Sequence, residues 1–164
     1  MKLQWTKSGS VLSQTIRHLL NEPVSHFSFS FDNFLVIHSD LLGVGLVGRH
    51  KFLDHHEVVY EIDPGYTRQE EDDLYYNLEE NFDDKGYDYK AFCYFSYRAL
   101  LYKTIRAPIP KTSKYNDGRS FLCTEMAGLL PGWDQLTSGN HIDLSITSPY
   151  KLYKYMIPIY GKGS

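Results

Sequence analysis

In the segment 25–31, every second residue from position 26 on is polar, and the residues that follow each of them are all phenylalanine. The polar positions include His26, Ser28 and Ser30. Strict alternation with a period of two predicts a strand with one buried face and one polar face. The Asp32–Asn33 pair that follows predicts a turn, and the next apolar run predicts a returning strand.

Further apolar runs predict more strands, separated by short polar connections. An antiparallel meander is the simplest arrangement for consecutive strands of this kind. After the segment 25–31, the predicted strands are residues 34–39, 43–47 and 57–62. A further short strand is predicted near the carboxyl end, at residues 153–157.

Helical periodicity appears in segments where apolar residues recur every three or four positions. In one of them Thr67 is the expected N-cap and Glu70 follows three residues later, which is the pattern of a capping box. The predicted helices are residues 10–20, 67–82, 91–105 and 120–130. Together with the strands, they predict an α+β fold in one domain that spans residues 1–164.

Composition narrows the classes of function. The formal net charge is −3, and the Lys and Arg residues are scattered, so a nucleic-acid partner is not expected. The first residues lack the apolar stretch of a secretory signal, and no run of about 18 apolar residues suggests a membrane span. We therefore expect a cytoplasmic protein without integral membrane association.

The two cysteines, Cys93 and Cys123, are too few for a disulfide scaffold, although a single bridge between them stays open. Cys123 falls near the start of the predicted helix 120–130. A thiolate there would be stabilised by the free backbone N–H groups and by the helix dipole. A cysteine in a helix is more often a small buried hydrophobe, so packing is the alternative. Cys93 lies in an aromatic run and is expected to be buried and inert.

His26 is a candidate base for such a thiol, and His38 could hold its ring through the second nitrogen. Their placement depends on the hairpin connection. A two-residue turn would put the two histidines on opposite faces of the sheet. A three-residue or bulged connection would pair Ser28 with His38 and put both histidines on the same face. The catalytic hypothesis therefore predicts an odd-length loop.

Other chemistry is less well supported by the residue pattern. His50, His55 and His56 cluster in sequence, but no cysteine or carboxylate completes the spacing of a closed zinc site. The glycines at 43, 45 and 48 do not follow a dinucleotide-binding pattern. We expect no metal and no cofactor.

Several segments resemble the circularly permuted NlpC/P60 cysteine peptidases, a papain-like group that includes the YiiX-like and lecithin:retinol acyltransferase-like families. Residues 9–26 resemble the helix that leads into the Ser-His strand, and residues 35–44 the strand with the third catalytic residue. Residues 122–125 resemble the Cys-Ser-Glu that opens the catalytic helix, and residues 146–152 a closing element. The order of histidine before cysteine is that of the permuted members.

This resemblance implies a permuted papain-like fold, with an antiparallel sheet packed against the cysteine helix. It also implies thiol acyl transfer, with Cys123 as nucleophile, His26 as base and His38 as its orienting partner. Residues 86–89 match in part a Gly-x-x-Tyr-Asp region of the family, which makes Tyr87 a candidate oxyanion donor. The oxyanion would also be stabilised by the backbone N–H of Cys123.

Three functions remain open at this stage. The first is hydrolysis of an amide bond in a peptide or isopeptide, for example in peptidoglycan. The second is a lipid acyl hydrolase or acyltransferase, for which the second histidine at position 38 is typical; the Asn-Cys-Glu-His motif of that branch is absent. The third is a binding module that has lost activity.

If the chain is virally encoded, we expect it in the host cytoplasm or the virion.

Overall fold

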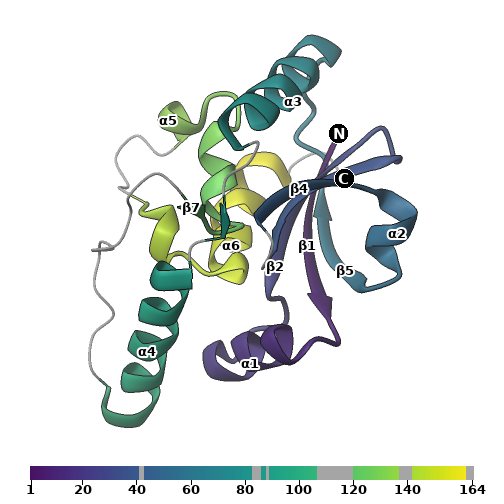
Figure 1. The fold of residues 1–164 in the computed structure, drawn as a ribbon. Coiled ribbons are helices and arrows are strands. Elements are labelled where there is room, and N and C mark those ends of the chain that lie inside the picture. Colours follow the sequence, from purple (N-terminus) through teal and green to yellow (C-terminus); the bar gives the residue numbers. More distant parts are fainter. Residues whose placement is uncertain (41–42, 83–85, 88, 107–119, 137–141, 162–164) are drawn as a thin grey trace.

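A computed structural model gives the chain an α+β fold, in which helices surround one antiparallel sheet of five strands (Figure 1). The strand order is β4-β3-β2-β1-β5. The strands are β1 (Lys2–Ser8), β2 (His26–Phe31), β3 (Leu35–Asp40), β4 (Gly43–Gly48) and β5 (His56–Ile62). The structure describes residues 1–40, 43–82, 86–87, 89–106, 120–136 and 142–161.

The hairpin between β2 and β3 has the odd-length connection that places both histidines on one face. Phe31 pairs with Leu35, which leaves three residues in the loop, and Ser28 pairs with His38. Asp32 and Asn33 have φ angles of 47° and 59°, a left-handed conformation that these two residue types tolerate well. The register prediction is confirmed: His26 and His38 are diagonal neighbours on the same face.

Strand β1 was not expected from the sequence, although it is an interior strand of the sheet. It pairs with β2 on one side and with β5 on the other, both antiparallel. The predicted meander is therefore correct for β2, β3 and β4, but wrong for β5, which joins the opposite edge. A bulge between Trp5 and Thr6 shifts the register of the β1–β5 pair.

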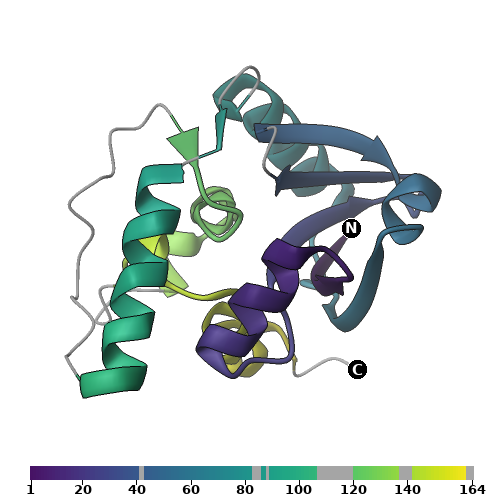
Figure 2. The same cartoon turned by 60° about the horizontal axis from the view of Figure 1, so that its bottom comes forward.

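Helices cover both sides of the sheet. Figures 1 and 2 show α4, α6 and η1 on one side and the short helix α2 on the other. The helices are α1 (Val11–Leu20), α2 (Arg49–Leu53), α3 (Arg68–Phe82), α4 (Tyr89–Ile105), α5 (Trp133–Leu136) and α6 (Pro149–Tyr160), with 3₁₀ turns η1 (Glu125–Leu129) and η2 (Leu144–Ile146). Two short strands, β6 (Gly86–Tyr87) and β7 (Ser120–Phe121), form a separate parallel pair.

Helix α6 occupies the segment for which the sequence predicted a strand. The Ser148 side chain accepts a hydrogen bond from the Lys151 N–H at 3.2 Å, and Pro149 stands at the first helical position. Both features start a helix. The prediction of a strand at 153–157 is therefore wrong, because a local capping pattern outweighs the aromatic and β-branched composition of the segment.

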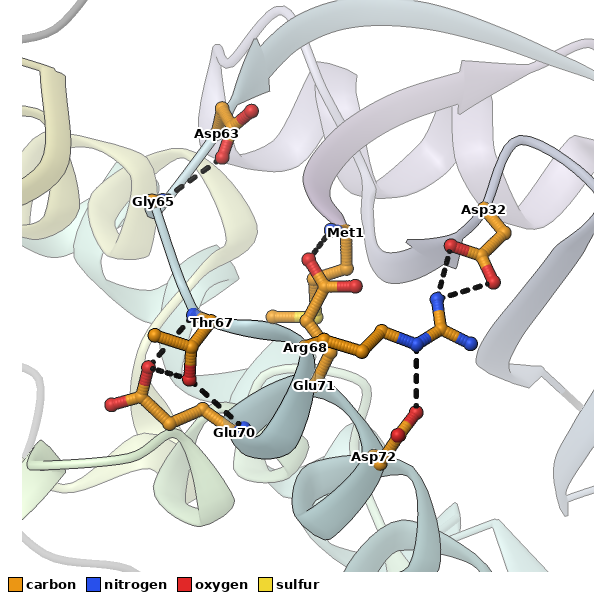
Figure 3. Close-up of polar contacts among 9 residues, drawn as sticks. All are labelled: Met1, Asp32, Asp63, Gly65, Thr67, Arg68, Glu70, Glu71 and Asp72. Carbon is orange, nitrogen blue, oxygen red and sulfur yellow. Dashed lines mark hydrogen bonds and ion pairs between the residues drawn. The ribbon is translucent and has the colours of Figure 1, made fainter.

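Helix α3 begins with the predicted capping box, drawn in Figure 3. The Thr67 N–H donates to Glu70 Oε2 at 2.8 Å, and the Glu70 N–H donates to Thr67 Oγ1 at 3.3 Å. Two backbone donors that the helix leaves free are satisfied in this way. This prediction is confirmed.

The same end of α3 is tied to the sheet by charged contacts (Figure 3). The Arg68 guanidinium donates to both carboxylate oxygens of Asp32 in the hairpin loop, at 2.8 and 2.7 Å. It also pairs with Asp72 at 3.3 Å. The Met1 ammonium forms an ion pair with Glu71. These contacts fix α3 against the β2–β3 loop and the start of β1.

The hydrophobic core lies between the sheet and the helices on the α6 side. Its largest fully buried side chains include Trp5, Phe27, Phe29, Leu74, Leu78, Met126, Leu152 and Met156. The opposite face of β2 is buried as well, since Ser28 and Ser30 are 0% and 2% exposed. The expected half-buried strand is thus covered on both faces, and Phe52 of α2 (2% exposed) contributes to this second layer.

Candidate functional site

Cys123 lies in a turn between β7 and η1, and not in the first turn of an α-helix. The segment 120–130 forms two strand residues, a turn and a five-residue 3₁₀ helix. The Leu122 N–H donates to Glu125 Oε2 at 2.8 Å, which closes this turn. The predicted helix and its dipole effect on the thiol are therefore wrong, because local side-chain bonding favours the turn.

The thiol of Cys123 is buried, with 8% of the residue exposed. Burial raises its pKa to about 11, since the protein interior disfavours the thiolate. Three backbone N–H groups oppose this shift by hydrogen bonding to the sulfur: those of Phe27, Thr124 and Cys123 itself. The resting group is therefore a neutral thiol that already has donors in place for a thiolate.

The hydrogen bond from the Phe27 N–H links Cys123 directly to the strand that carries His26. Phe27 follows His26 in β2, and the pairing of β2 with β3 begins only at Ser28. The Cys123 sulfur thus lies beside the first peptide group of β2. Among the described contacts, no hydrogen bond joins the thiol to the His26 imidazole, whose side chain points to the other face of the strand.

His26 and His38 contact each other edge to face, with ring centroids 5.4 Å apart. Nε2 of His26 and Nδ1 of His38 are buried and have no hydrogen-bond partner among the described residues. Burial lowers both pKa values; neighbouring histidines lower them further, while Asp40 acts in the opposite direction on His38. Both rings are therefore neutral at pH 7, and the predicted orienting hydrogen bond between them is not formed.

His56 completes a cluster with these two histidines. Its ring centroid lies 5.5 Å from that of His26 and 5.9 Å from that of His38. The ring stacks on Phe52 at 4.2 Å, and its Nδ1 donates to the Phe52 carbonyl at 3.2 Å. Burial lowers the pKa of His56 too. From the sequence, His56 was considered only as a possible metal ligand, and its place in this cluster was not predicted.

No group of three or more His, Cys, Asp or Glu residues in the described part of the chain has an arrangement that could hold a metal ion. The three rings pack against one another and against Phe52. Because burial lowers their pKa values, all three rings are neutral, and the protein interior disfavours protonation of any of them.

Tyr87 lies in β6, whose partner strand β7 runs directly into the Cys123 turn. Its backbone pairs with Phe121, two residues before the cysteine. The position of its side chain lies outside what the structure describes, so its role as oxyanion donor stays a prediction. Cys93 is exposed on α4, and the prediction that it is buried is therefore wrong.

No protein-family model matches the chain, and neither a curated protein nor a solved structure gives a match. Among the helices that the structure describes, none has the length and apolar character needed to cross a membrane.

Proposed function

We propose that this protein is a cysteine hydrolase of the circularly permuted NlpC/P60 type, which cleaves an amide bond of a peptide or isopeptide. Cys123 is the nucleophile, His26 the general base and His38 the residue that positions the base. The hydrogen bond from the Phe27 N–H to the Cys123 sulfur carries this proposal, because it sets the only buried thiol among the described residues against the peptide group that joins His26 to Phe27. The pairing of β2 with β3 brings His38 next to His26 on the same face of the sheet.

Because the Cys123 thiol and the His26 imidazole are both neutral, a proton has to pass from the sulfur to the imidazole during the reaction. The Cys123 thiol attacks the substrate carbonyl carbon, its proton passes to the His26 imidazole, and a carbon–sulfur bond forms. The C–N bond then breaks, and the imidazolium returns the proton to the leaving amine. Water adds to the thioester with the same base, which releases the acid and restores the thiol. The backbone N–H groups at the sulfur stabilise the transient thiolate.

Substrate binding has to bring the thiol and the imidazole into hydrogen-bond distance. Catalytic hydrogen bonds are often long in the absence of substrate and shorten in the complex. The free Nε2 of His26 leaves this ring without a competing bond to break. The thiol and the imidazole are both neutral before the reaction, and charge develops on them only as the sulfur attacks. The imidazole therefore acts as a general base, and no thiolate–imidazolium ion pair forms beforehand.

Labelling with an electrophilic acyl probe tests the proposal. Wild-type protein and Cys93→Ser should gain the mass of one acyl group at Cys123, and Cys123→Ser should gain none there. His26→Gln should slow labelling by about 100-fold, since loss of a positioned base typically costs 10² to 10⁴ in rate. Intact-mass and peptide mass spectrometry give both readouts.

Amide and ester forms of the probe distinguish the two enzymatic alternatives. Faster turnover of the amide agrees with the proposed peptidase, whereas turnover of the ester alone contradicts amide cleavage and indicates an acyl hydrolase. If His26→Gln labels at the wild-type rate, the proposed base is wrong. If Cys123 fails to react in folded wild-type protein, the thiol mechanism itself is refuted.

A further inference from the structure

A pocket of about 740 Å³ opens next to the histidine cluster. It lies where the end of β1 and the start of β5 meet helices α1 and α2. Its lining includes Lys7, Ser8, Arg17, Arg49 and His56. Figure 2 shows α1 beside α4, with which it is in contact, and α2 on the far side of the strands from α4.

Two arginines of the lining, Arg17 and Arg49, form no ion pair within the described part of the chain. Nε of Arg17 and Nε of Arg49 are each buried without a hydrogen-bond acceptor. Because an unsatisfied buried donor costs free energy, a ligand that supplies acceptors would stabilise both side chains.

Asp54 and Glu57 line the pocket together with the arginines. Glu57 binds Lys7 at 2.9 Å, and Glu61 binds Lys2 at 2.6 Å and also interacts electrostatically with Arg49. With Lys7 paired to Glu57, the two arginines face one further lining carboxylate, Asp54, and leave the lining with a net positive charge.

Guanidinium groups bind carboxylate and phosphate through pairs of parallel N–H···O bonds. Arg17 belongs to α1 and Arg49 to α2, so their guanidinium groups can bind one anion from two directions. Ser8 adds a hydroxyl to the lining. The chemistry of the pocket thus fits a compact oxyanion.

The position of the pocket relates this anion to the candidate site. His56 lines the pocket and its ring lies 5.5 Å from that of His26. An anion held between Arg17 and Arg49 would sit on the far side of the histidine cluster from Cys123. An anionic group held in the pocket would therefore bring the rest of a substrate close to His26, the proposed base.

We propose that this pocket binds an anionic group of the substrate, a carboxylate or a phosphate, through Arg17 and Arg49. The assignment of the anion to a substrate rests on the proposed function. Binding of the anion itself does not, because it requires neither Cys123 nor its chemistry.

Titration with inorganic phosphate and, separately, with acetate tests the pocket. The side-chain Nε–H resonances of Arg17 and Arg49 should shift with a saturable dependence on at least one of the two anions. Arg17→Gln and Arg49→Gln should each weaken binding by about tenfold, the size expected for loss of a charge-assisted hydrogen bond. Lys51→Gln is the matched control: it removes an exposed charge from the same helix α2 and should leave binding unchanged.

The two anions identify the ligand chemistry, since tighter binding of acetate indicates a carboxylate and tighter binding of phosphate indicates a phosphate group. If neither shifts the arginine resonances, or if Lys51→Gln weakens binding as much as the arginine variants, the proposal is wrong. The titration is repeated with Cys123→Ser. Anion binding that persists in this variant shows that the pocket binds anions independently of Cys123, whether or not the thiol mechanism is correct.

Discussion

The two cysteines occupy opposite environments, and this difference decides how each thiol reacts. Cys123 is packed in the core cluster with Phe27 and Met126, whereas Cys93 is exposed on α4. A thiolate is the reactive form of cysteine, and both burial and a raised pKa reduce its population. Reactivity toward simple reagents should therefore follow exposure, while reactivity toward a bound substrate should depend on the proposed base, His26.

Alkylation of the free protein with iodoacetamide should modify Cys93 faster than Cys123 at pH 7.5. The rate at Cys123 should rise by about tenfold per pH unit up to about 11, because the thiolate fraction grows with pH below its pKa. Peptide mass spectrometry at several pH values measures both rates. Rapid labelling of Cys123 at pH 6 would contradict the neutral thiol and support the stabilised thiolate considered from the sequence.

At the level of elements, the three-residue loop between β2 and β3 controls which side chains share a face. Deleting Asn33 shortens the connection to two residues and forces the hairpin into another register. His38 would then point into the apolar core, which buries a polar group without a partner. We expect the free energy of unfolding to fall by roughly 3 kcal/mol or more.

Asn33→Gly is the control for this deletion, since it keeps the loop length and the positive φ of 59°. Urea unfolding followed by circular dichroism gives the two free energies. The control should stay within about 1 kcal/mol of the wild-type value. Equal stability of the deletion variant and the wild type would show that the loop does not set the register.

Local patterns predicted the elements that depend on local interactions. Alternation and turn residues were enough for β2 and β3, and the capping box was enough for α3. Strand β1 was missed because its segment, with Lys2 and Lys7 near its ends, lacks the apolar or β-branched richness of a typical central strand. Strand β5 was placed at the wrong edge because its partner is this missing strand.

The candidate site was likewise predictable only where it depends on interactions between residues close in the sequence. His26 and His38 belong to one hairpin, so the number of residues in its loop determines whether their side chains lie on the same face of the sheet. His56 joins them only through the long-range pairing of β1 with β5, which includes a bulge that no sequence pattern revealed. The environment of Cys123 depends on Glu125 and on the Phe27 backbone, which turn the expected helix into a buried turn.

For the whole molecule, the cluster of neutral histidines makes stability depend on pH. The pKa values of His26, His38 and His56 are lowered by burial in the folded state, relative to an unfolded value near 6.5. Below pH 6.5 the unfolded chain therefore binds protons that the folded protein excludes. Stability is full above pH 6.5 and falls as the pH drops, by up to about 1.4 kcal/mol per pH unit for each group.

Denaturant unfolding at pH 7.5, 6.5 and 5.5 measures this dependence. His56→Gln removes one titrating group and should flatten the decline between pH 6.5 and 5.5. His50→Gln changes a ring that is 96% exposed and should keep the wild-type slope. A wild-type free energy that does not change across this range would refute the neutral cluster.

The interior place of β1 has a consequence for synthesis on the ribosome. Its residues emerge before those of β5, so one of its edges stays unpaired until Ile62, the partner of Leu3, has left the exit tunnel. During this interval the nascent chain exposes an open strand edge, which is a template for pairing with other chains. Slow translation of residues 32–62 would prolong this exposure, so codon choice in that stretch should affect the yield of correctly folded protein.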